Sequence, residues 1–327
     1  MRVLVTGSSG HLGEALVRTL RGSDHEVVGL DTRPSPFTNE NGSVADRGIV
    51  RRCMRGVNAV LHTATLHKPH IVTHRWEEFA ETNVNGTLVL LEEAASAHVS
   101  AFVFTSTTSV FGDALLPPPN APAAWITEEV VPLPANVYGI TKRTAEDLCL
   151  LFNRKRGVPC LILRTSRFFP DEDDRAAVRE QYEDANVKIN EYLYRRVDLQ
   201  DAVDAHLLAM HRAPQIGFGR YIISATTPFG SHDLAQLRGD APLVVKRHFP
   251  AYEDEYVRRG WRMFPGIERV YVNGRARAEL GWEPRYDFAY VLGRLREDQD
   301  YRSPLAQAVG TKGYHRDSFQ DGRYPTE

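Results

Sequence analysis

Tyr138 and Lys142 lie four residues apart in the segment 136–156, whose apolar residues recur at helical spacing. Residues four apart project from the same face of a helix, so the phenol and the ammonium should share one space. A phenol, with an ordinary pKa of about 10, is a poor base at neutral pH, but a nearby lysine cation favours the phenolate and lowers that pKa. Such a pair can exchange a proton with a hydroxyl or carbonyl group of a substrate. Because this spacing also occurs by chance in many helices, the neighbouring elements decide its meaning.

A run of hydroxyl side chains at 106–109 follows the apolar segment 101–105, which is typical of a buried strand. In an open parallel sheet, ligands bind at the carboxyl ends of the strands. We therefore expect these hydroxyls to lie at the same edge as Tyr138 and to line one site with it.

A glycine-rich turn near the start of the chain joins an apolar strand to an amphipathic helix. Gly7 and Gly10 allow a tight turn and the close approach of a pyrophosphate, and Gly13 lets the helix pack against the strand. The free N–H groups and the positive dipole end of the helix favour an anion there. The turn therefore predicts a bound dinucleotide, and the alternative is a glycine-rich turn that binds nothing.

Asp31 ends the second apolar strand, about twenty residues after the glycines. Its carboxylate can accept hydrogen bonds from both hydroxyls of an adenosine ribose, which favours NAD as the cofactor and would repel the 2′-phosphate of NADP. Arg33 leaves some room for the phosphorylated form, and Asp31 could instead simply begin a turn. With NAD bound, the nicotinamide would exchange a hydride while Tyr138 exchanges a proton.

Strands and helices alternate through the first half of the chain, which predicts an α/β fold with a Rossmann-type, doubly wound parallel sheet. Beyond 226 the segments are short and mixed, which suggests a smaller C-terminal substrate lobe over the carboxyl edge of the sheet. The expected strands are 57–62, 101–105, 160–164 and 220–224, and the expected helices are 76–97, 136–156 and 201–211. The expected domains are an NAD-binding Rossmann domain at 1–165 with 191–225 returning to it, a substrate lobe at 166–190 and 226–300, and a polar C-terminal tail at 301–327.

The chain of 327 residues has a formal net charge of −2 at pH 7, with acidic and basic residues interspersed. This balance gives no electrostatic footprint for nucleic acid, and no apolar run approaches the length of a membrane span. Cys53, Cys149 and Cys160 are widely separated, which is typical of reduced thiols. Met1 leads directly into the first strand and leaves no space for a signal peptide, so we expect a cytoplasmic protein without nucleic-acid or membrane partners.

The chain resembles the extended short-chain dehydrogenases/reductases, in particular the NAD-dependent epimerase/dehydratase group. By this resemblance Tyr138 is the catalytic acid/base, Lys142 holds the nicotinamide ribose and tunes Tyr138, and Thr107 hydrogen-bonds the reacting oxygen. The family more often has serine at this last position, but a threonine hydroxyl donates equally well. Ser106 is the alternative if the register differs by one. The residues that carry the resemblance are Thr6 to Gly13, Asp31, His62 to Ala64, Asn83 to Thr87, the hydroxyl run before Gly112, Tyr138 to Lys142, and Glu279 to Pro284.

The resemblance also implies which residues bind NAD and which bind the substrate. Ser43 and Val44 would lie near the adenine, and Ala64 would line the cofactor cleft. Asn83 would support the nicotinamide side, although it could instead be a helix-surface amide. The implied NAD-binding residues are Gly7, Ser9, Gly10, His11, Leu12, Gly13, Asp31, Arg33, Ser43, Val44, Ala64, Asn83, Tyr138 and Lys142. The implied substrate-binding residues are His67, Thr107, Thr108 and Arg167.

Arg167 stands where relatives that act on nucleotide sugars usually have asparagine, so this segment departs from the nucleotide-sugar pattern. Its guanidinium suits a carboxylate or phosphate of the substrate, or could instead pair with the acidic run 171–174. The stretch from Arg164 through Ser166 to Arg175 is similar to the corresponding region of uronate dehydrogenases, which oxidise free sugar acids.

Two histidines, His67 and His70, flank Lys68 after an expected strand. A metal site would need further ligands, and no carboxylate or cysteine joins them at ligand spacing. We therefore expect no metal, and we expect His67 to contact an anionic substrate group or solvent.

The predicted function is that of an NAD-dependent oxidoreductase or epimerase acting on a secondary alcohol of a sugar or sugar-derived substrate, nucleotide-linked and acidic sugars included. Thr108 and Ser109 stand where dehydratases of the family usually carry an acidic pair, which argues against dehydration. The alternatives are a carbonyl reductase of a nonsugar metabolite and a non-catalytic NAD-binding regulatory protein. The resemblance further implies a homodimer formed through the helices 76–97 and 136–156.

Overall fold

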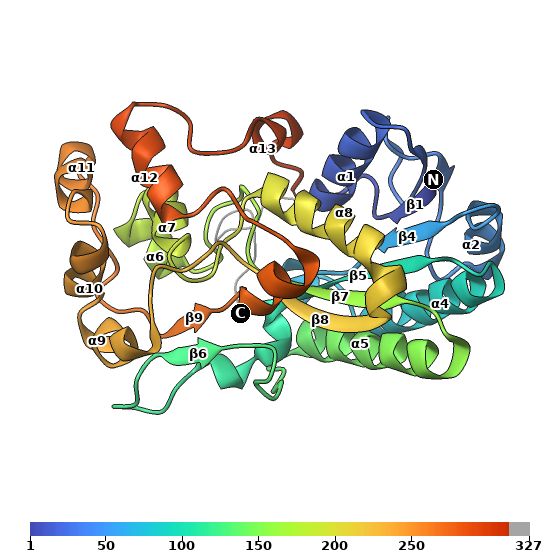
Figure 1. Cartoon of the computed structure of the whole chain (residues 1–327), viewed down its shortest axis with the longest axis horizontal. Helices are drawn as coiled ribbons and strands as arrows, with labels where there is room; N and C mark the ends of the chain where they lie inside the picture. The colour runs from blue at the N-terminus through green and yellow to red at the C-terminus, as the bar shows by residue number, and fades with distance from the viewer. Residues whose placement is uncertain (314–327) are drawn as a thin grey trace.

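Seven parallel strands form one sheet in the computed structural model, which describes residues 1–313 (Figure 1). The strand order is β3-β2-β1-β4-β5-β7-β8, so the predicted doubly wound, Rossmann-type sheet is confirmed. The order reverses between β1 and β4, and ligands of such folds bind in the crevice above that reversal. The strands are β1 (Arg2–Thr6), β2 (Glu26–Asp31), β3 (Glu40–Asn41), β4 (Ala59–His62), β5 (Ala101–Thr107), β7 (Cys160–Thr165) and β8 (Phe218–Ile223).

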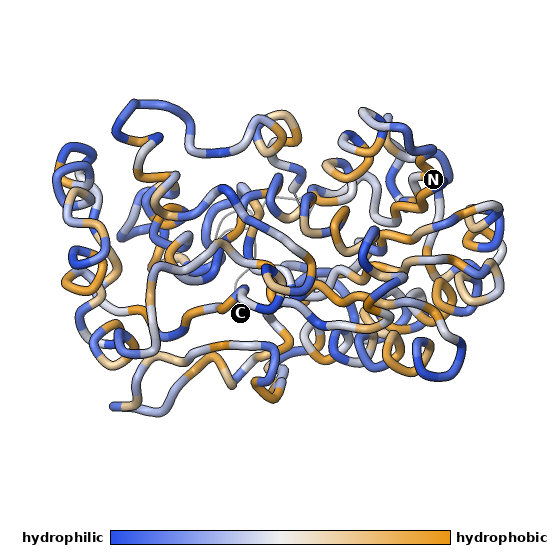
Figure 2. The backbone as a smooth tube through the Cα atoms, viewed as in Figure 1, coloured by the Kyte–Doolittle hydropathy of each residue, from blue (hydrophilic) through white to orange (hydrophobic). Residues whose placement is uncertain are grey.

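Helices cover both faces of the sheet (Figure 1). On one face, α1 (His11–Arg21) and α8 (Leu199–Ile216) share an apolar core with the strands. On the other face, α2 (Arg47–Cys53), α4 (Gly86–Ser96) and α5 (Val137–Arg156) do the same. Figure 2 shows the most apolar stretches along the strands, with polar residues on the outer sides of the helices. Both faces are therefore buried, and the carboxyl edge of the sheet is where a ligand can approach.

The start and end of α5 follow from two residues. Asn136 caps the helix, because its side-chain oxygen accepts a hydrogen bond from the N–H of Gly139 at 3.0 Å. Gly157 ends it in the left-handed conformation, with φ of 70°, which glycine adopts without strain. Tyr138 therefore lies in the first turn of α5 and Lys142 in the next, as the predicted helix 136–156 requires.

The predicted helix 76–97 contains a change of pitch. It is built from α3 (Trp76–Phe79), the π-helical turn η2 (Ala80–Asn85) and α4. The side chain of Asn83, in this wider turn, is buried. Short turns elsewhere are the 3₁₀ helices η1 (Lys68–His70), η3 (Thr108–Phe111), η4 (Asp113–Leu115) and η5 (Ser231–Asp233), and the π-helical turn η6 (Ala276–Leu280).

A smaller lobe stands beside the carboxyl edge of the sheet and has its own apolar core (Figure 1). Two segments depart from the predicted boundaries. The strand β6, expected in the Rossmann domain, pairs with β9 of the lobe, whereas Leu280 and Trp282, expected in the lobe, pack on the α8 face of the sheet. The lobe elements are β6 (Ala124–Ile126), α6 (Ala176–Gln181), α7 (Asp184–Glu191), α9 (Leu234–Gly239), α10 (Ala241–His248), α11 (Tyr252–Arg259), β9 (Arg269–Tyr271) and α12 (Phe288–Arg296).

The start of the expected polar tail 301–327 is packed against the Rossmann domain. The helix α13 (Pro304–Val309) buries Val309 against the core that α1 and α8 share. The backbone N–H of Lys312 donates a hydrogen bond of 3.0 Å to His11 Nε2 at the start of α1. Residues 314–327 of the expected tail lie outside the described residues.

Candidate active site

A cavity of about 1490 Å³ lies at the carboxyl edge of the sheet. Its wall is made by segments at the carboxyl ends of β1, β2, β4, β5 and β7, and by residues 264–269 of the lobe. The glycine turn, the hydroxyl run and Tyr138 all face this one cavity. The fold therefore brings together the three features that the sequence places far apart.

The glycine turn at the floor of the cavity has no room for side chains at its ends. A Cβ atom on Gly13 would lie 1.9 Å from the carbonyl oxygen of Gly7, and Gly7 itself has φ of +70°. Gly10 caps α1, and no side chain of the described residues caps this helix in its place. The first N–H groups of a helix lack intrahelical acceptors, so this helix start fits a pyrophosphate.

Asp31 closes the glycine turn. Its Oδ2 accepts a hydrogen bond of 2.9 Å from the N–H of Ser9, and its Oδ1 accepts one of 2.8 Å from the N–H of Arg33. Asp31 thus begins a turn, as the alternative interpretation holds, and it also lines the cavity. A carboxylate oxygen accepts more than one hydrogen bond, so Asp31 keeps capacity for the hydroxyls of a ribose.

Apart from Tyr138 and Lys142, the remaining residues predicted for the cofactor lie on the cavity wall, with the exception of Asn83. Asn83 lies behind the wall, where its Oδ1 accepts hydrogen bonds of 2.8 Å from the Leu66 N–H and from Thr65 Oγ1. Its Nδ2 donates to Thr141 Oγ1 at 3.1 Å, which ties the loop after β4 to α5. Because Asn83 is buried, the surface-amide alternative is wrong. The residues on the wall are Ser9, His11, Leu12, Arg33, Ser43, Val44 and Ala64.

Tyr138 and Thr107 form a hydrogen-bonded pair on the cavity wall. Their side chains share a hydrogen bond, and the Thr107 oxygen also accepts from the N–H of Ser109 at 3.1 Å. The pKa of Tyr138 is raised to about 12 because the phenol is buried, and the hydrogen bond from Thr107 opposes this rise. In the protein alone the net shift is therefore upward, and the lowering of this pKa by Lys142 stays a prediction.

Ser106, the alternative to Thr107, is engaged elsewhere. Its hydroxyl donates a hydrogen bond of 2.7 Å to Glu146 of α5. The same carboxylate accepts two hydrogen bonds from Arg164 of β7, of 2.8 and 3.0 Å. Ser106 thus belongs to a buried ionic group that joins α5 to the sheet, which leaves Thr107 as the hydroxyl that meets Tyr138.

Lys142 lies behind Tyr138, in the interior rather than on the cavity wall. Its side chain is almost completely buried, and the ammonium lies 4.0 Å from the centroid of the Phe104 ring. Burial lowers the pKa of Lys142 to about 7, against the opposing effects of Cys149 and Glu146. Its predicted contact with a nicotinamide ribose stays a prediction.

Aromatic rings connect the reactive end of the cavity to the start of α1. The His67 ring lies 5.9 Å from the Tyr138 ring and 5.7 Å from the Phe169 ring, between centroids. Phe169 in turn lies 5.7 Å from the His11 ring. Burial lowers the pKa of His67 well below its ordinary value. This predicted substrate residue is therefore an uncharged imidazole on the cavity wall at pH 7.

Arg167 reaches the cavity, but its guanidinium is bound by carboxylates. It donates to Asp173 at 2.6 Å, to Glu191 at 3.1 Å and to Asp174 at 3.3 Å. Burial alone would raise the pKa of Glu191, but the guanidinium groups around it hold that pKa well below its ordinary value. The pairing of Arg167 with the acidic run, which the sequence left open, is thus what the structure contains.

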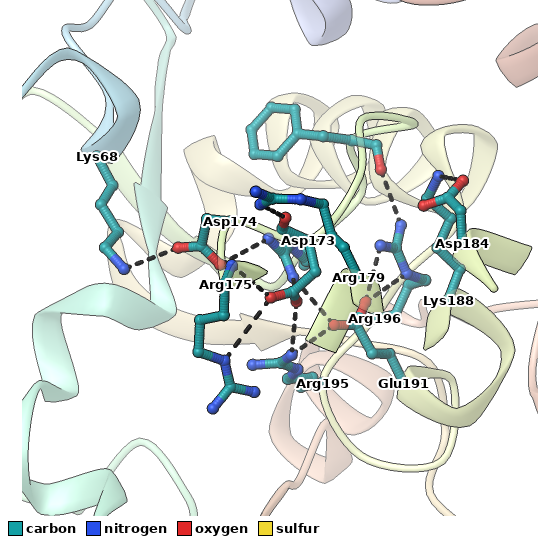
Figure 3. A network of polar contacts seen from close by, with 12 residues as sticks. Lys68, Asp173, Asp174, Arg175, Arg179, Asp184, Lys188, Glu191, Arg195 and Arg196 are labelled. Atoms are coloured by element: carbon teal, nitrogen blue, oxygen red, sulfur yellow. Dashed lines mark hydrogen bonds and ion pairs between the residues drawn. The ribbon is translucent and has the colours of Figure 1, made fainter. Parts of the chain in front are cut away.

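Figure 3 shows the ionic cluster around these carboxylates. Arg195 donates to Glu191 at 2.6 Å, and Arg196 donates to the same carboxylate at 2.9 Å. Lys68 reaches Asp174 from the loop after β4, at 2.9 Å. The cluster therefore links that loop, the segment after β7 and the end of α7 into one wall of the cavity.

The predicted site omits several polar residues of the cavity wall, among them Ser166, Arg175 and Arg195. Ser166 is buried, and its hydroxyl has no hydrogen-bond partner among residues 1–313. Arg175 is two-thirds exposed, with a contact of 3.7 Å to Asp173, and Arg195 lines the cavity beside it. The similarity to uronate dehydrogenases already pointed to Ser166 and Arg175. No sequence signal marks Arg195, because its position depends on the ionic cluster.

Residues 1–313 contain neither a candidate metal centre nor a candidate membrane span. No group of three or more histidine, cysteine, aspartate or glutamate side chains within this range is arranged to hold a metal ion. No helix in the same range is both long enough and apolar enough to cross a membrane. The expected absence of a metal stays a prediction.

Comparisons with known proteins agree with this geometry. A model of the NAD dependent epimerase/dehydratase family matches residues 3–219. A UDP-glucose 4-epimerase of Streptomyces lividans is 24% identical over 343 residues, which cover 89% of this chain and 94% of that enzyme. A crystal structure of a short-chain dehydrogenase/reductase superfamily protein from Agrobacterium tumefaciens, solved with bound NAD, has a TM-score of 0.64 at 25% identity and covers 94% of this chain and 99% of its own.

Other matches are shorter. An uncharacterised protein of Sinorhizobium fredii is 31% identical over 166 residues, which cover 49% of this chain and 39% of that protein. For three curated relatives of 28 to 31% identity, the match spans only 39 to 55% of the relative, so the chain spans about half their length. The family match covers most of the chain, including the glycine turn, the hydroxyl run and α5. On this evidence the chain belongs to the NAD-dependent epimerase/dehydratase family of extended short-chain dehydrogenases/reductases.

Proposed function

We propose that this protein is an NAD-dependent oxidoreductase that reversibly oxidises a secondary alcohol of a sugar-derived substrate carrying an anionic group. The observation that carries the proposal is the hydrogen-bonded pair of Thr107 and Tyr138, which lies in the same cavity as the glycine turn. A non-catalytic dinucleotide-binding protein would have no need of a buried phenol paired with a hydroxyl at this position.

The chemistry assigned to the pair is proton transfer. Bound NAD would supply a hydride acceptor for the alcohol carbon, so the hydroxyl proton of the substrate would need a base. Tyr138 accepts that proton as the phenolate, and Thr107 donates a hydrogen bond to the reacting oxygen. The positive charges of Lys142 and of an oxidised nicotinamide ring both favour the phenolate, which offsets the effect of burial on its pKa.

The residues assigned to NAD follow from the floor of the cavity. The start of α1 would hold the pyrophosphate through backbone N–H groups, and Asp31 would accept hydrogen bonds from the adenosine ribose. A second phosphate on that ribose would meet the carboxylate of Asp31, so we assign NAD rather than NADP. Lys142 would hold the nicotinamide ribose from behind Tyr138.

The anionic group of the substrate is assigned to Ser166 and Arg175. Arg167 is a poor candidate because Asp173, Asp174 and Glu191 already occupy its guanidinium. Arg175 has only a long contact to Asp173, and Ser166 carries a buried hydroxyl without a partner among the described residues. A planar guanidinium and a free hydroxyl together suit a carboxylate, so a free sugar acid is the substrate class that we favour.

A second candidate is the epimerisation of a nucleotide sugar. It is favoured by relatives that cover most of the chain and are named UDP-glucose 4-epimerase, from Streptomyces lividans among others. An epimerase returns the hydride to the same substrate and keeps its cofactor, whereas a dehydrogenase releases NADH.

One experiment separates these candidates. The purified protein is denatured and the released dinucleotide is identified by mass spectrometry, and the native protein is incubated with NAD and either hexuronates, neutral hexoses or UDP-glucose. We expect an exchangeable cofactor and NADH formation with a hexuronate. Stoichiometric retained NAD, with UDP-glucose converted and no NADH formed, would establish the epimerase instead. Reduction of nonsugar carbonyls alone would favour a carbonyl reductase.

We also propose that the protein is a cytoplasmic homodimer. The exposed side chains of Trp76 on α3 and of Ile140 and Leu151 on α5 give the two expected helices an apolar outer surface. The buried, free thiols of Cys53, Cys149 and Cys160 suit a reducing compartment. Light scattering coupled to gel filtration would measure the mass, and a monomer at micromolar concentration would contradict the dimer.

A further inference from the structure

Asp171 is a buried carboxylate that faces the cavity without a matching donor. Its side chain is only 2% exposed, and neither carboxylate oxygen has a hydrogen-bond partner within residues 1–313. Among residues 1–313, Asp171 Oδ2 makes an ionic contact with His11 Nε2 at 3.9 Å, which is too long for a hydrogen bond. Burying a carboxyl group without hydrogen-bond partners is unfavourable, so such a group is usually matched by something that binds.

His11 does not supply the missing proton. The N–H of Lys312 donates to His11 Nε2, so this nitrogen acts as an acceptor. Burial also lowers the pKa of His11 to about 4, although Asp171 opposes this shift. The ammonium of Lys312 is itself bound by Glu14. His11 Nε2 and the ammonium of Lys312 are therefore already bound to groups other than Asp171.

The neighbouring acids of the same segment, Asp173 and Asp174, have hydrogen-bond donors as partners. Asp173 and Asp174 both accept hydrogen bonds from Arg167, and Asp174 also accepts one from Lys68. Figure 3 shows these two carboxylates inside the ionic cluster. Asp171 is thus an exception within a segment that otherwise pairs its buried acids.

The position of Asp171 indicates which part of a dinucleotide it would meet. The chain of ring contacts from Tyr138 through His67 and Phe169 ends at His11, beside which Asp171 lies. In the proposed function the pyrophosphate binds at the start of α1 and the hydride is exchanged at Tyr138. Asp171 lies on the segment after β7, two residues beyond Phe169, whose ring contacts both His11 and His67. It therefore approaches the start of α1 from the side of the cavity that holds Tyr138, which is the side of the nicotinamide.

We propose that Asp171 is the counter-charge for the oxidised nicotinamide ring, so that it makes the site prefer NAD⁺ over NADH. This inference rests on the proposed function, because it requires NAD to bind in this cavity. The oxidised ring carries a positive charge and the reduced ring is neutral, whereas the adenosine and the pyrophosphate are identical in the two forms. A carboxylate near the ring therefore changes the ratio of the affinities for NAD⁺ and NADH. It does not change the contribution that the adenosine and the pyrophosphate make to both affinities.

The test compares the dissociation constants of NAD⁺ and NADH, measured by isothermal titration calorimetry without substrate. In Asp171→Asn we expect the preference for NAD⁺ over NADH to fall by about tenfold or more relative to the wild type. The matched control is Glu172→Gln, which removes the same charge from the next residue, an exposed one on the same cavity. We expect this control to change the ratio by less than about twofold.

Other outcomes are equally decisive. If Asp171→Asn alters both affinities by the same factor, or only the KM for a hexuronate, the inference is overturned while the proposed function stands. If the wild type binds neither dinucleotide, the proposed function fails and this inference fails with it. The melting temperature of nucleotide-free Asp171→Asn should equal or exceed that of the wild type, because an unmatched buried charge is removed. A large drop would mean that Asp171 has a structural partner, which also overturns the inference.

Discussion

Thr107 and Tyr138 share a side-chain hydrogen bond, whereas Ser106, one residue earlier on β5, donates to Glu146 instead. Adjacent hydroxyls thus have separate roles, one at the cavity and one in the buried ionic group of α5 and β7. Removing the Thr107 hydroxyl should lower kcat by about 10²-fold, because a donor to the reacting oxygen is lost, with a small change in stability. Thr107→Ser should restore most of the rate.

Ser106→Ala is the matched control for that prediction. It removes a donor from the buried carboxylate of Glu146, so the free energy of unfolding should fall by about 1 to 3 kcal/mol while kcat changes little. Steady-state kinetics and urea denaturation of Thr107→Ala, Thr107→Ser and Ser106→Ala measure both effects. The assignment of Thr107 is wrong if Ser106→Ala loses activity and Thr107→Ala keeps it.

The glycine turn should tolerate no side chain at Gly13. A Cβ there would lie 1.9 Å from the carbonyl oxygen of Gly7, so the turn must shift and the N–H groups at the start of α1 move with it. Gly13→Ala should weaken NAD binding by at least tenfold, as measured by calorimetry. Gly293→Ala in α12, where a Cβ meets nothing within 4 Å, should leave NAD binding unchanged and stabilise the fold slightly.

Lys142 should make the stability of the free protein rise with pH. Its pKa is about 7 in the folded state and about 10.5 in the unfolded state, so the unfolded chain binds more protons between these values. Raising the pH through this window therefore favours folding, by roughly 1 kcal/mol per pH unit. Lys142→Met should remove this rise while abolishing turnover. Urea denaturation of both proteins at several pH values between 7 and 9 gives the comparison, and parallel slopes would show that Lys142 is not the titrating group.

Arg175 and Arg167 should respond to substitution in opposite ways. Arg175 is largely exposed and weakly paired, so Arg175→Ala should leave stability unchanged and raise the KM for a hexuronate by about tenfold or more. Arg167→Ala removes a partner from Asp173 and Glu191, so it should lower the free energy of unfolding by about 2 kcal/mol or more.

The informative measurements are KM and denaturation midpoint for each variant. Arg175→Lys serves as the control, since it keeps the charge but loses the planar guanidinium. Its KM for the hexuronate should lie between those of the wild type and Arg175→Ala. An unchanged KM in Arg175→Ala, with a raised KM in Arg167→Ala, would mean that Arg167, and not Arg175, binds the anionic group of the substrate.

The sequence predicts the features that depend on local spacing. The glycine turn, the helix expected at 136–156 and the spacing of Tyr138 and Lys142 each depend on residues close together in the chain, and each lies where it is expected. The order of strands and helices follows from the same local patterns, and it places these features at one edge of the sheet.

The sequence could not predict the features that depend on tertiary packing. The partners of Arg167 include Glu191, which belongs to another helix, and the unmatched state of Asp171 depends on Lys312 near the end of the described chain. The raised pKa of Tyr138 has the same origin, because it follows from burial by the whole wall. The π-helical turn that buries the side chain of Asn83 also corresponds to no sequence pattern that would predict it.

The most direct test of the central claim is a comparison of wild type and Tyr138→Phe with the hexuronate that reduces NAD fastest. Stopped-flow absorbance measures NADH formation in a single turnover, and calorimetry measures NAD affinity. Tyr138→Phe should slow NADH formation by several orders of magnitude and change the affinity for NAD little, because only the proton acceptor is lost. An unchanged rate of NADH formation in Tyr138→Phe would contradict the account.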